Sequence, residues 1–203
     1  MPLVKGKYQP TNPLYSALGQ TANATQGNLG QRTNASCTGL NAATDQAAAL
    51  TTQVCTSVAV PVEVGDVITK ITVLVGATAA GTPTNGFAAL YSGITVPALL
   101  GQATDITSNA IAASAGFTFT LASPVMATSA LAPQGFIYVS IMSKATTVPS
   151  LASTALAAAV GYKWFGNSPL FFAATHGSAL TNLAPATIVA PTAQTVVPLV
   201  FLT

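Results

Sequence analysis

Apolar and polar residues alternate along several short stretches of this chain. A period of two places every second side chain on the same face of a β-strand. The faces predicted in this way are Val54, Thr56, Val58 and Val60; Ile71, Val73 and Val75; and Phe117, Phe119 and Leu121. Thr118 and Thr120 lie between the residues of the last face, so we expect this strand to bury its apolar face and expose its hydroxyls.

Two further stretches predict strands of other kinds. Residues 136–142 are apolar on both faces, which is typical of a central strand. Residues 195–203 predict a last strand, in which Pro198 indicates an edge or a bulge. Two alanine-rich segments, residues 41–50 and 151–160, fit either helices or loops. Glycine- and proline-containing turns separate the strands, and this spacing predicts an all-β fold, an antiparallel jelly-roll-like β-sandwich.

The first 33 residues show no such period and are rich in Asn, Gln, Gly, Thr and Pro. A segment of this kind cannot bury a core of its own. We expect residues 1–33 to be an extended N-terminal arm, either loose or ordered by docking on a neighbour. The sandwich then spans residues 34–203, with a long excursion at about 146–194. The candidate residues for docking the arm to a shell are Lys5, Lys7, Tyr8, Tyr15 and Arg32.

The small number of charged residues excludes several classes of protein. The 203 residues include six Lys and Arg and four Asp and Glu, so that only 5% are charged. Disordered chains combine low hydrophobicity with high net charge, and half of this chain is apolar. Six scattered cations cannot build a nucleic-acid-binding face. So weakly charged a surface is most economically explained if copies of the chain or a larger assembly cover it.

Neither membrane insertion nor export is expected. The uncharged stretches 71–104 and 164–203 are broken by Gly, Pro, Thr and Asn, and neither offers the roughly 18–20 continuous apolar residues of a spanning helix. Residues 1–13 contain no apolar segment of a secretory signal. Cys37 and Cys55 are therefore expected to be free, buried thiols, and a bridge between adjacent strands is the open alternative.

The sequence contains few candidate residues for catalysis or metal binding. His176 is the only histidine, and a histidine beside a glycine is usually a turn or surface residue. Glu63 and Asp66 flank Gly65 in a predicted hairpin turn, where acids are usually solvated. One histidine, two cysteines and four acids on separate strands do not form a metal site. We expect no enzyme, no cofactor and no metal.

Aromatic residues gather in one region near the C-terminus. Rings in a loop can form a sugar-binding platform, a subunit contact or a plug over one end of a sandwich. Packing or subunit contact is the favoured interpretation. The candidate contact or ligand residues are Tyr162, Trp164, Phe165, Phe171, Phe172 and His176.

Several short motifs, taken in order, resemble a known family. They are Val64–Thr69, Val75–Asn85, Ala89–Tyr91, Leu99–Asp105, Phe119–Leu121, Gly135–Val139 and Ala145–Pro149. In this order they resemble virion structural proteins of tailed bacteriophages, especially those infecting actinobacteria. The resemblance implies a β-sandwich module on the virion surface, in the head or the tail, with no catalytic residues to carry over. The N-terminal arm and the residues after Ala152 depart from the family pattern.

These observations lead to one expected function and one alternative. We expect a non-enzymatic capsid decoration or head-fibre protein, assembled in the host cytoplasm and carried on the virion. It would form a homo-oligomer, a trimer in the simplest case, and bind the major capsid protein or other virion proteins. The alternative is a minor tail or baseplate protein that binds a host surface glycan through the loop around Trp164.

Overall fold

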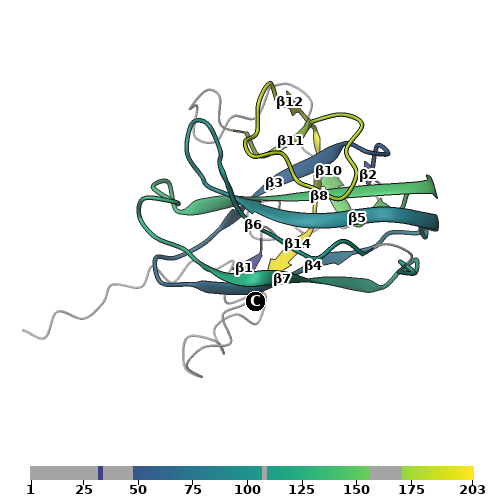
Figure 1. Cartoon of the computed structure of the whole chain (residues 1–203), viewed down its shortest axis with the longest axis horizontal. Coiled ribbons are helices and arrows are strands. Elements are labelled where there is room, and N and C mark those ends of the chain that lie inside the picture. The colour runs from purple at the N-terminus through teal and green to yellow at the C-terminus, as the bar shows by residue number, and fades with distance from the viewer. Residues whose placement is uncertain (1–31, 34–47, 107–108, 156–170) are drawn as a thin grey trace, which may run out of the picture. The chain divides into compact units, whose positions relative to one another are not determined.

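Every element that the structure describes is a β-strand. The computed structural model describes residues 32–33, 48–106, 109–155 and 171–203. The chain divides after Gly30, and all of these strands belong to the unit Gln31–Thr203. The long strands form two antiparallel sheets (Figure 1), which confirms the predicted all-β, sandwich-like class. Within the described ranges no helix is long and apolar enough to cross a membrane.

The larger sheet has six strands. In spatial order they are β12 (Thr192–Ala193), β11 (Ala173–His176), β3 (Cys55–Pro61), β8 (Phe136–Thr147), β5 (Gly81–Tyr91) and β6 (Leu99–Gln102). The apolar stretch predicted to be central is indeed central, because β8 pairs with β3 on one side and with β5 on the other. Both faces of β3 and of most of β8 are buried, so this sheet is covered on two sides.

The smaller sheet has four strands. In order they are β1 (Arg32–Thr33), β14 (Val200–Leu202), β4 (Val67–Leu74) and β7 (Gly116–Met126). Two short ladders complete the unit: β2 (Ala48–Ala49) with β9 (Ser150–Leu151), and β10 (Ser153–Ala155) with β13 (Val196–Pro198). Strand β1 contains Arg32, so the last two residues of the expected arm pair with the C-terminal strand.

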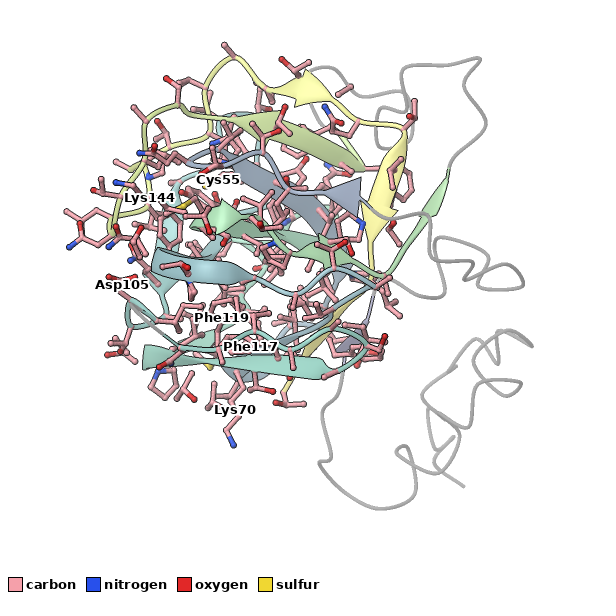
Figure 2. The ribbon with its side chains drawn as sticks, turned by 90° about the vertical axis from the view of Figure 1, so that its right-hand side faces the viewer. Cys55, Lys70, Asp105, Phe117, Phe119 and Lys144 are labelled. Atoms are coloured by element: carbon pink, nitrogen blue, oxygen red, sulfur yellow. The ribbon has the colours of Figure 1, made fainter. Side chains whose placement is uncertain are left out.

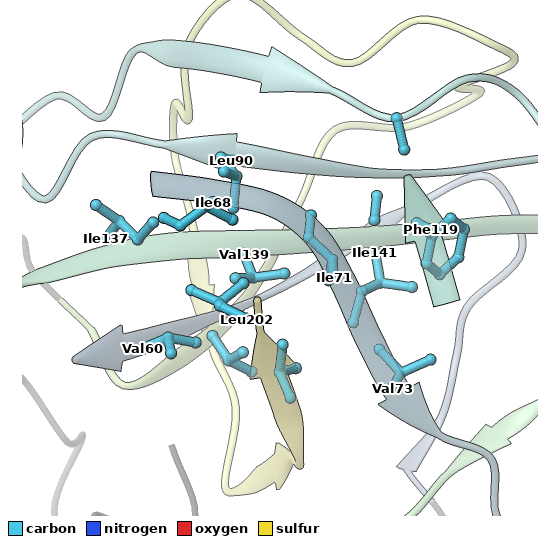
Figure 3. Close-up of a cluster of buried hydrophobic side chains, with 14 of the residues drawn as sticks. Val60, Ile68, Ile71, Val73, Leu90, Phe119, Ile137, Val139, Ile141 and Leu202 are labelled. Atoms are coloured by element: carbon cyan, nitrogen blue, oxygen red, sulfur yellow. The ribbon is translucent and has the colours of Figure 1, made fainter. Parts of the chain in front are cut away.

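The main core lies between the two sheets. Ile71 and Val73 of β4 and Phe119 of β7 meet Val139 and Ile141 of β8 there (Figure 3). Of these, Ile71, Val73 and Phe119 are at the positions that alternation placed on one face of their strands. Polar side chains lie on the opposite face of the smaller sheet. Lys70 projects from β4 away from the core (Figure 2), and Oγ1 of Thr72 lies 2.8 Å from Oγ1 of Thr118.

The last strand is divided where the sequence predicted an edge or a bulge. Residues 196–198 pair with β10, and residues 200–202 pair with β4, so the chain changes ladder at Leu199. Pro198 lacks an N–H and cannot donate a ladder hydrogen bond, which favours a break at this point. The alanine-rich segments contain strand where they are described, since β2, β9 and β10 lie at their ends.

The region 146–194 contributes strands to the sandwich as well as loops. Strand β8 extends to Thr147, and β11 pairs with β3 over four residues and widens the larger sheet. After β11 the chain crosses the outer face of this sheet as Gly177–Pro191, here called the covering segment (Figure 1). The outer face is the one that points away from the smaller sheet. Covering it explains why β3 and β8 are buried on both sides.

Candidate functional site

The outer face of the larger sheet carries a second buried cluster, separate from the main core. Its members come from β3, β5 and β8, from β11 and the residues just before it, and from the covering segment. They are Cys55, Ala59, Phe87, Ala89, Tyr91, Phe136, Tyr138, Met142, Phe171, Ala174 and Ile188. Because side chains on a strand alternate between faces, these residues occupy the odd positions of β3 and β5 and the even positions of β8.

Side-chain hydrogen bonds hold the covering segment on this face. Nε2 of Gln102 donates to the carbonyl of Asn182 (2.6 Å), and its Oε1 accepts from the N–H of Ala184 (2.7 Å). The hydroxyl of Tyr91 donates to the carbonyl of Pro185 (2.8 Å). At the other end, Gln53 and Leu180 are joined by one backbone and one side-chain hydrogen bond, both 3.0 Å long.

Three polar side chains form a hydrogen-bonded group under this cover, here called the His176 cluster: Ser57 on β3, Ser140 on β8 and His176 on β11. Nε2 of His176 lies 2.8 Å from Oγ of Ser57 and 3.3 Å from Oγ of Ser140, and the two hydroxyls bond each other. A neutral imidazole can accept one hydroxyl proton at Nε2, and the second hydroxyl can then donate to the first.

The position of these residues in the sheet explains why the imidazole fits. Ala174, Ser57, Ser140 and Ala89 lie in one row across β11, β3, β8 and β5. All four side chains are small, so the row leaves room above it for a ring. His176 lies two residues further along β11, opposite Cys55, and its ring lies over this row toward the hydroxyls. Tyr91 meets the imidazole edge-on, with ring centroids 5.9 Å apart.

Burial shifts the pKa of every titratable group that the structure describes here. Desolvation lowers the pKa of His176 to about 4, because the surroundings disfavour the imidazolium. The same cause raises the pKa of the Cys55 thiol and of the Tyr138 phenol, each to about 12. It also raises the pKa of Tyr91. At neutral pH the cluster is therefore uncharged.

The chemical capacity of the His176 cluster is limited by access. A serine 2.8 Å from a histidine nitrogen is the geometry of an activated nucleophile. However, Ser57 and Ser140 have no solvent exposure, so no substrate carbonyl can approach either hydroxyl in this conformation. The carboxylates that are described serve elsewhere: Asp66 caps a turn at Glu63, and Asp105 accepts from Asn85 and Gly86. The arrangement supports a structural role.

An apolar hollow lies beside the second buried cluster of the outer face. Its volume is about 330 Å³. Tyr138 and Phe171 lie at its inner side with their rings stacked, centroids 4.4 Å apart and planes at 27°. The remaining lining residues come from the loop before β6 and from the end of the covering segment: Thr95, Val96, Pro97, Ile188, Val189, Ala190 and Pro191.

The sequence-predicted site residues fall into three groups. Phe171 is buried and lines the hollow, and Phe172 packs against the same cluster. His176 is on a strand and only 5% exposed, so the interpretation of it as a turn or surface residue was wrong. Tyr162, Trp164 and Phe165 lie outside the described residues, as do the arm residues Lys5, Lys7, Tyr8 and Tyr15.

Sequence reasoning missed Ser57 and Ser140. Each is a serine in a mainly apolar stretch, on the face away from the main core. Two such serines, together with the only histidine of the chain, are the signal that could have suggested a buried polar group. Their proximity could not be predicted, because it depends on β11 pairing with β3. The predicted turn at Gly65 is present, with Gly65 at a φ of 98° and Glu63 exposed, but Asp66 is half-buried. The interpretation of this turn as a hairpin was wrong, because β3 lies in the larger sheet and β4 in the smaller one.

In comparisons with known proteins, the chain matches no protein-family model and no curated protein.

Proposed function

We propose that this chain is a non-enzymatic structural protein of a tailed-phage virion, a capsid decoration or head-fibre protein. It would stabilise the shell through oligomeric surface contacts, in the simplest case as a trimer. The observation that carries the proposal is a well-packed sandwich in a chain of which only 5% is charged. Such a surface dissolves poorly as isolated copies and is suited to being covered by neighbours.

Exposed apolar side chains at two places support this interpretation. Val67 of β4 and Met126 of β7 are paired on neighbouring strands of the smaller sheet, and both side chains are exposed. Val64, in the turn before β4, is exposed as well. A second place is the rim of the hollow, where Val96 and Val189 are exposed. Grouped apolar side chains on a surface mark contact sites more often than isolated ones do.

The alternative is a minor tail or baseplate protein that binds a host glycan. The lining of the hollow supports this alternative less well than it supports a contact between proteins. Sugar sites combine an aromatic platform with several polar groups that bond the hydroxyls of the sugar. Here Thr95 and Tyr138 supply the only hydroxyls of the lining, and the Tyr138 oxygen already accepts from the N–H of Phe171 at 3.2 Å. An apolar contact suits this lining better than a glycan does.

The jelly-roll-like topology and the docked arm belong to the same proposal. Successive long strands alternate between the sheets, since β3, β5 and β8 lie in the larger sheet and β4 and β7 in the smaller one. Crossing from sheet to sheet in this way is common to the sandwich architectures of viral coats. The arm of residues 1–33 would bind the shell through Lys5, Lys7, Tyr8, Tyr15 and Arg32, with the sandwich outward.

Particle binding tests the proposal. Labelled full-length protein would be mixed with tailed-phage particles that carry their tails but lack the decoration protein of the head, and bound protein would be separated by sedimentation. We expect hundreds of copies per head and a higher temperature for DNA release. A handful of copies at the tail, with adsorption lost in Trp164→Ala, would establish the alternative. A protein that stays a soluble single copy at high concentration and binds no particle would contradict both.

A further inference from the structure

The apolar hollow is the feature of the outer face that packing alone does not account for. Its two walls are held in place by backbone hydrogen bonds: the N–H of Ile188 donates to the carbonyl of Pro97, and the N–H of Leu99 donates to that of Ala186, both at 2.9 Å. These bonds fix the two walls relative to each other. A volume of about 330 Å³ is within the range of ligand pockets.

The lining defines what the hollow can accept. None of its nine residues is charged. Val96 and Val189, at the rim, are 55% and 64% exposed. A charged or highly hydroxylated ligand would lose its hydration without gaining partners in such a lining. The occupant must therefore be uncharged and mainly apolar, and the volume suits the side chains of a short peptide segment.

We propose that the hollow binds Pro13, Leu14 and Tyr15 of the N-terminal arm of a neighbouring copy of this chain. This inference rests on the proposed function, because it requires the chain to assemble. The three residues are consecutive and have an aromatic or aliphatic side chain. They lie in a stretch, residues 8–31, that contains no charged residue. In this arrangement Tyr15 contacts the neighbouring copy and not the shell, whereas Lys5, Lys7, Tyr8 and Arg32 stay available for the shell.

The length and anchoring of the arm make an exchange between copies feasible. Its C-terminal end is fixed on the sandwich, where Arg32 pairs with Leu202 and Thr33 with Phe201. The chain between Tyr15 and Arg32 can extend about 55 Å. A unit of this size has a radius of gyration of about 16 Å, so an adjacent copy lies within reach. Each copy would then cover the hollow of its neighbour, and the ring of contacts can close.

Disulfide trapping in the full-length protein tests this inference. All variants carry Cys37→Ser, so that the buried Cys55 is the one remaining native thiol. Protein with Leu14→Cys is mixed with protein with Val189→Cys and oxidised. The control partner is Val64→Cys, which replaces a valine that is 69% exposed and outside the hollow. We expect the Leu14→Cys and Val189→Cys pair to form dimers at least about tenfold faster than the control pair, because binding raises the effective concentration.

The other outcomes are equally informative. Equal rates for the two pairs, or no dimers, would overturn the inference. So would a bond that forms only within one chain when a doubly substituted protein, Leu14→Cys with Val189→Cys, is oxidised at the same concentration as the mixed pair. Head binding is measured with the same proteins. If binding persists without trapping, only the arm exchange is wrong; if trapping occurs without binding, only the proposed function is wrong.

Discussion

Nε2 of His176 lies 2.8 Å from Oγ of Ser57, across two neighbouring strands that are far apart in the sequence. The two residues are diagonal neighbours, since Ser57 pairs with Ala174 and His176 pairs with Cys55. Diagonal pairs on one face of a sheet are within reach of a long or aromatic side chain. This contact connects the added strand β11 to the centre of the sheet by a polar bond within an otherwise apolar layer.

The buried imidazole should make the stability of the fold depend on pH. The pKa of His176 is about 4 in the folded chain and about 6.5 when the chain is unfolded. Below pH 6.5 the histidine binds a proton in the unfolded chain but not in the folded chain. The free energy of unfolding is therefore highest above pH 6.5 and falls as the pH is lowered to about 4. We expect a loss of about 2.5 kcal/mol between pH 7.5 and pH 4.5, measured by urea unfolding. His176→Gln does not titrate, and its curve should lack this component; an unchanged pH dependence in that variant would contradict the assignment.

Replacing two buried serines by alanine should change the free energy of unfolding by different amounts. Ser57→Ala removes a partner of the imidazole, and we expect a loss of about 1–3 kcal/mol in the free energy of unfolding. The matched control is Ser143→Ala on β8. Ser143 is also buried, but its hydroxyl has no hydrogen-bond partner among the described residues. Its removal should therefore be neutral or slightly stabilising. Equal losses from both substitutions, measured by denaturant unfolding, would exclude a specific role for the His176 cluster.

A glycine next to β8 should be irreplaceable for lack of space. A Cβ at Gly93 would lie 2.0 Å from the carbonyl oxygen of Phe136, and a backbone atom cannot move aside easily. We expect Gly93→Ala to cost more than about 3 kcal/mol or to prevent folding. Gly116→Ala is the control, because its nearest neighbour would be 3.8 Å away. Thermal unfolding should show little change there, and a Gly93→Ala protein of native stability would disprove the close approach.

The thiol of Cys55 should be unreactive in the folded protein. It has no exposure, and burial raises its pKa to about 12, so that little thiolate exists at about pH 8. In Cys37→Ser protein we expect iodoacetamide to label Cys55 only after denaturant is added, as measured by intact mass. Rapid labelling of the native protein would mean that the outer face opens. The free Cys55 thiol agrees with the prediction made from the sequence.

Local pattern predicted the strands but not their partners. Alternation identified the inward residues of β4 and β7, and the doubly apolar stretch identified β8 as central, because these features depend only on which side chains must leave water. The site was less predictable. Phe171 was expected to lie in a contact region, and it lines the hollow. The roles of the Ser57 and Ser140 hydroxyls were missed, because the sequence of one strand does not show which side chains of other strands will lie beside a serine.

The amino-acid sequence by itself determined the strand-forming segments, the turn at Gly65 and an apolar, charge-poor composition, because period, turn propensity and charge are properties of neighbouring residues. Only the tertiary structure decided that β11 joins β3, that the chain changes ladder after Pro198, and that residues 177–191 cover the outer face. Those choices depend on which distant surfaces fit together. A small side chain at Ala174, Ser57 and Ser140 makes room for His176 only once the strands are side by side.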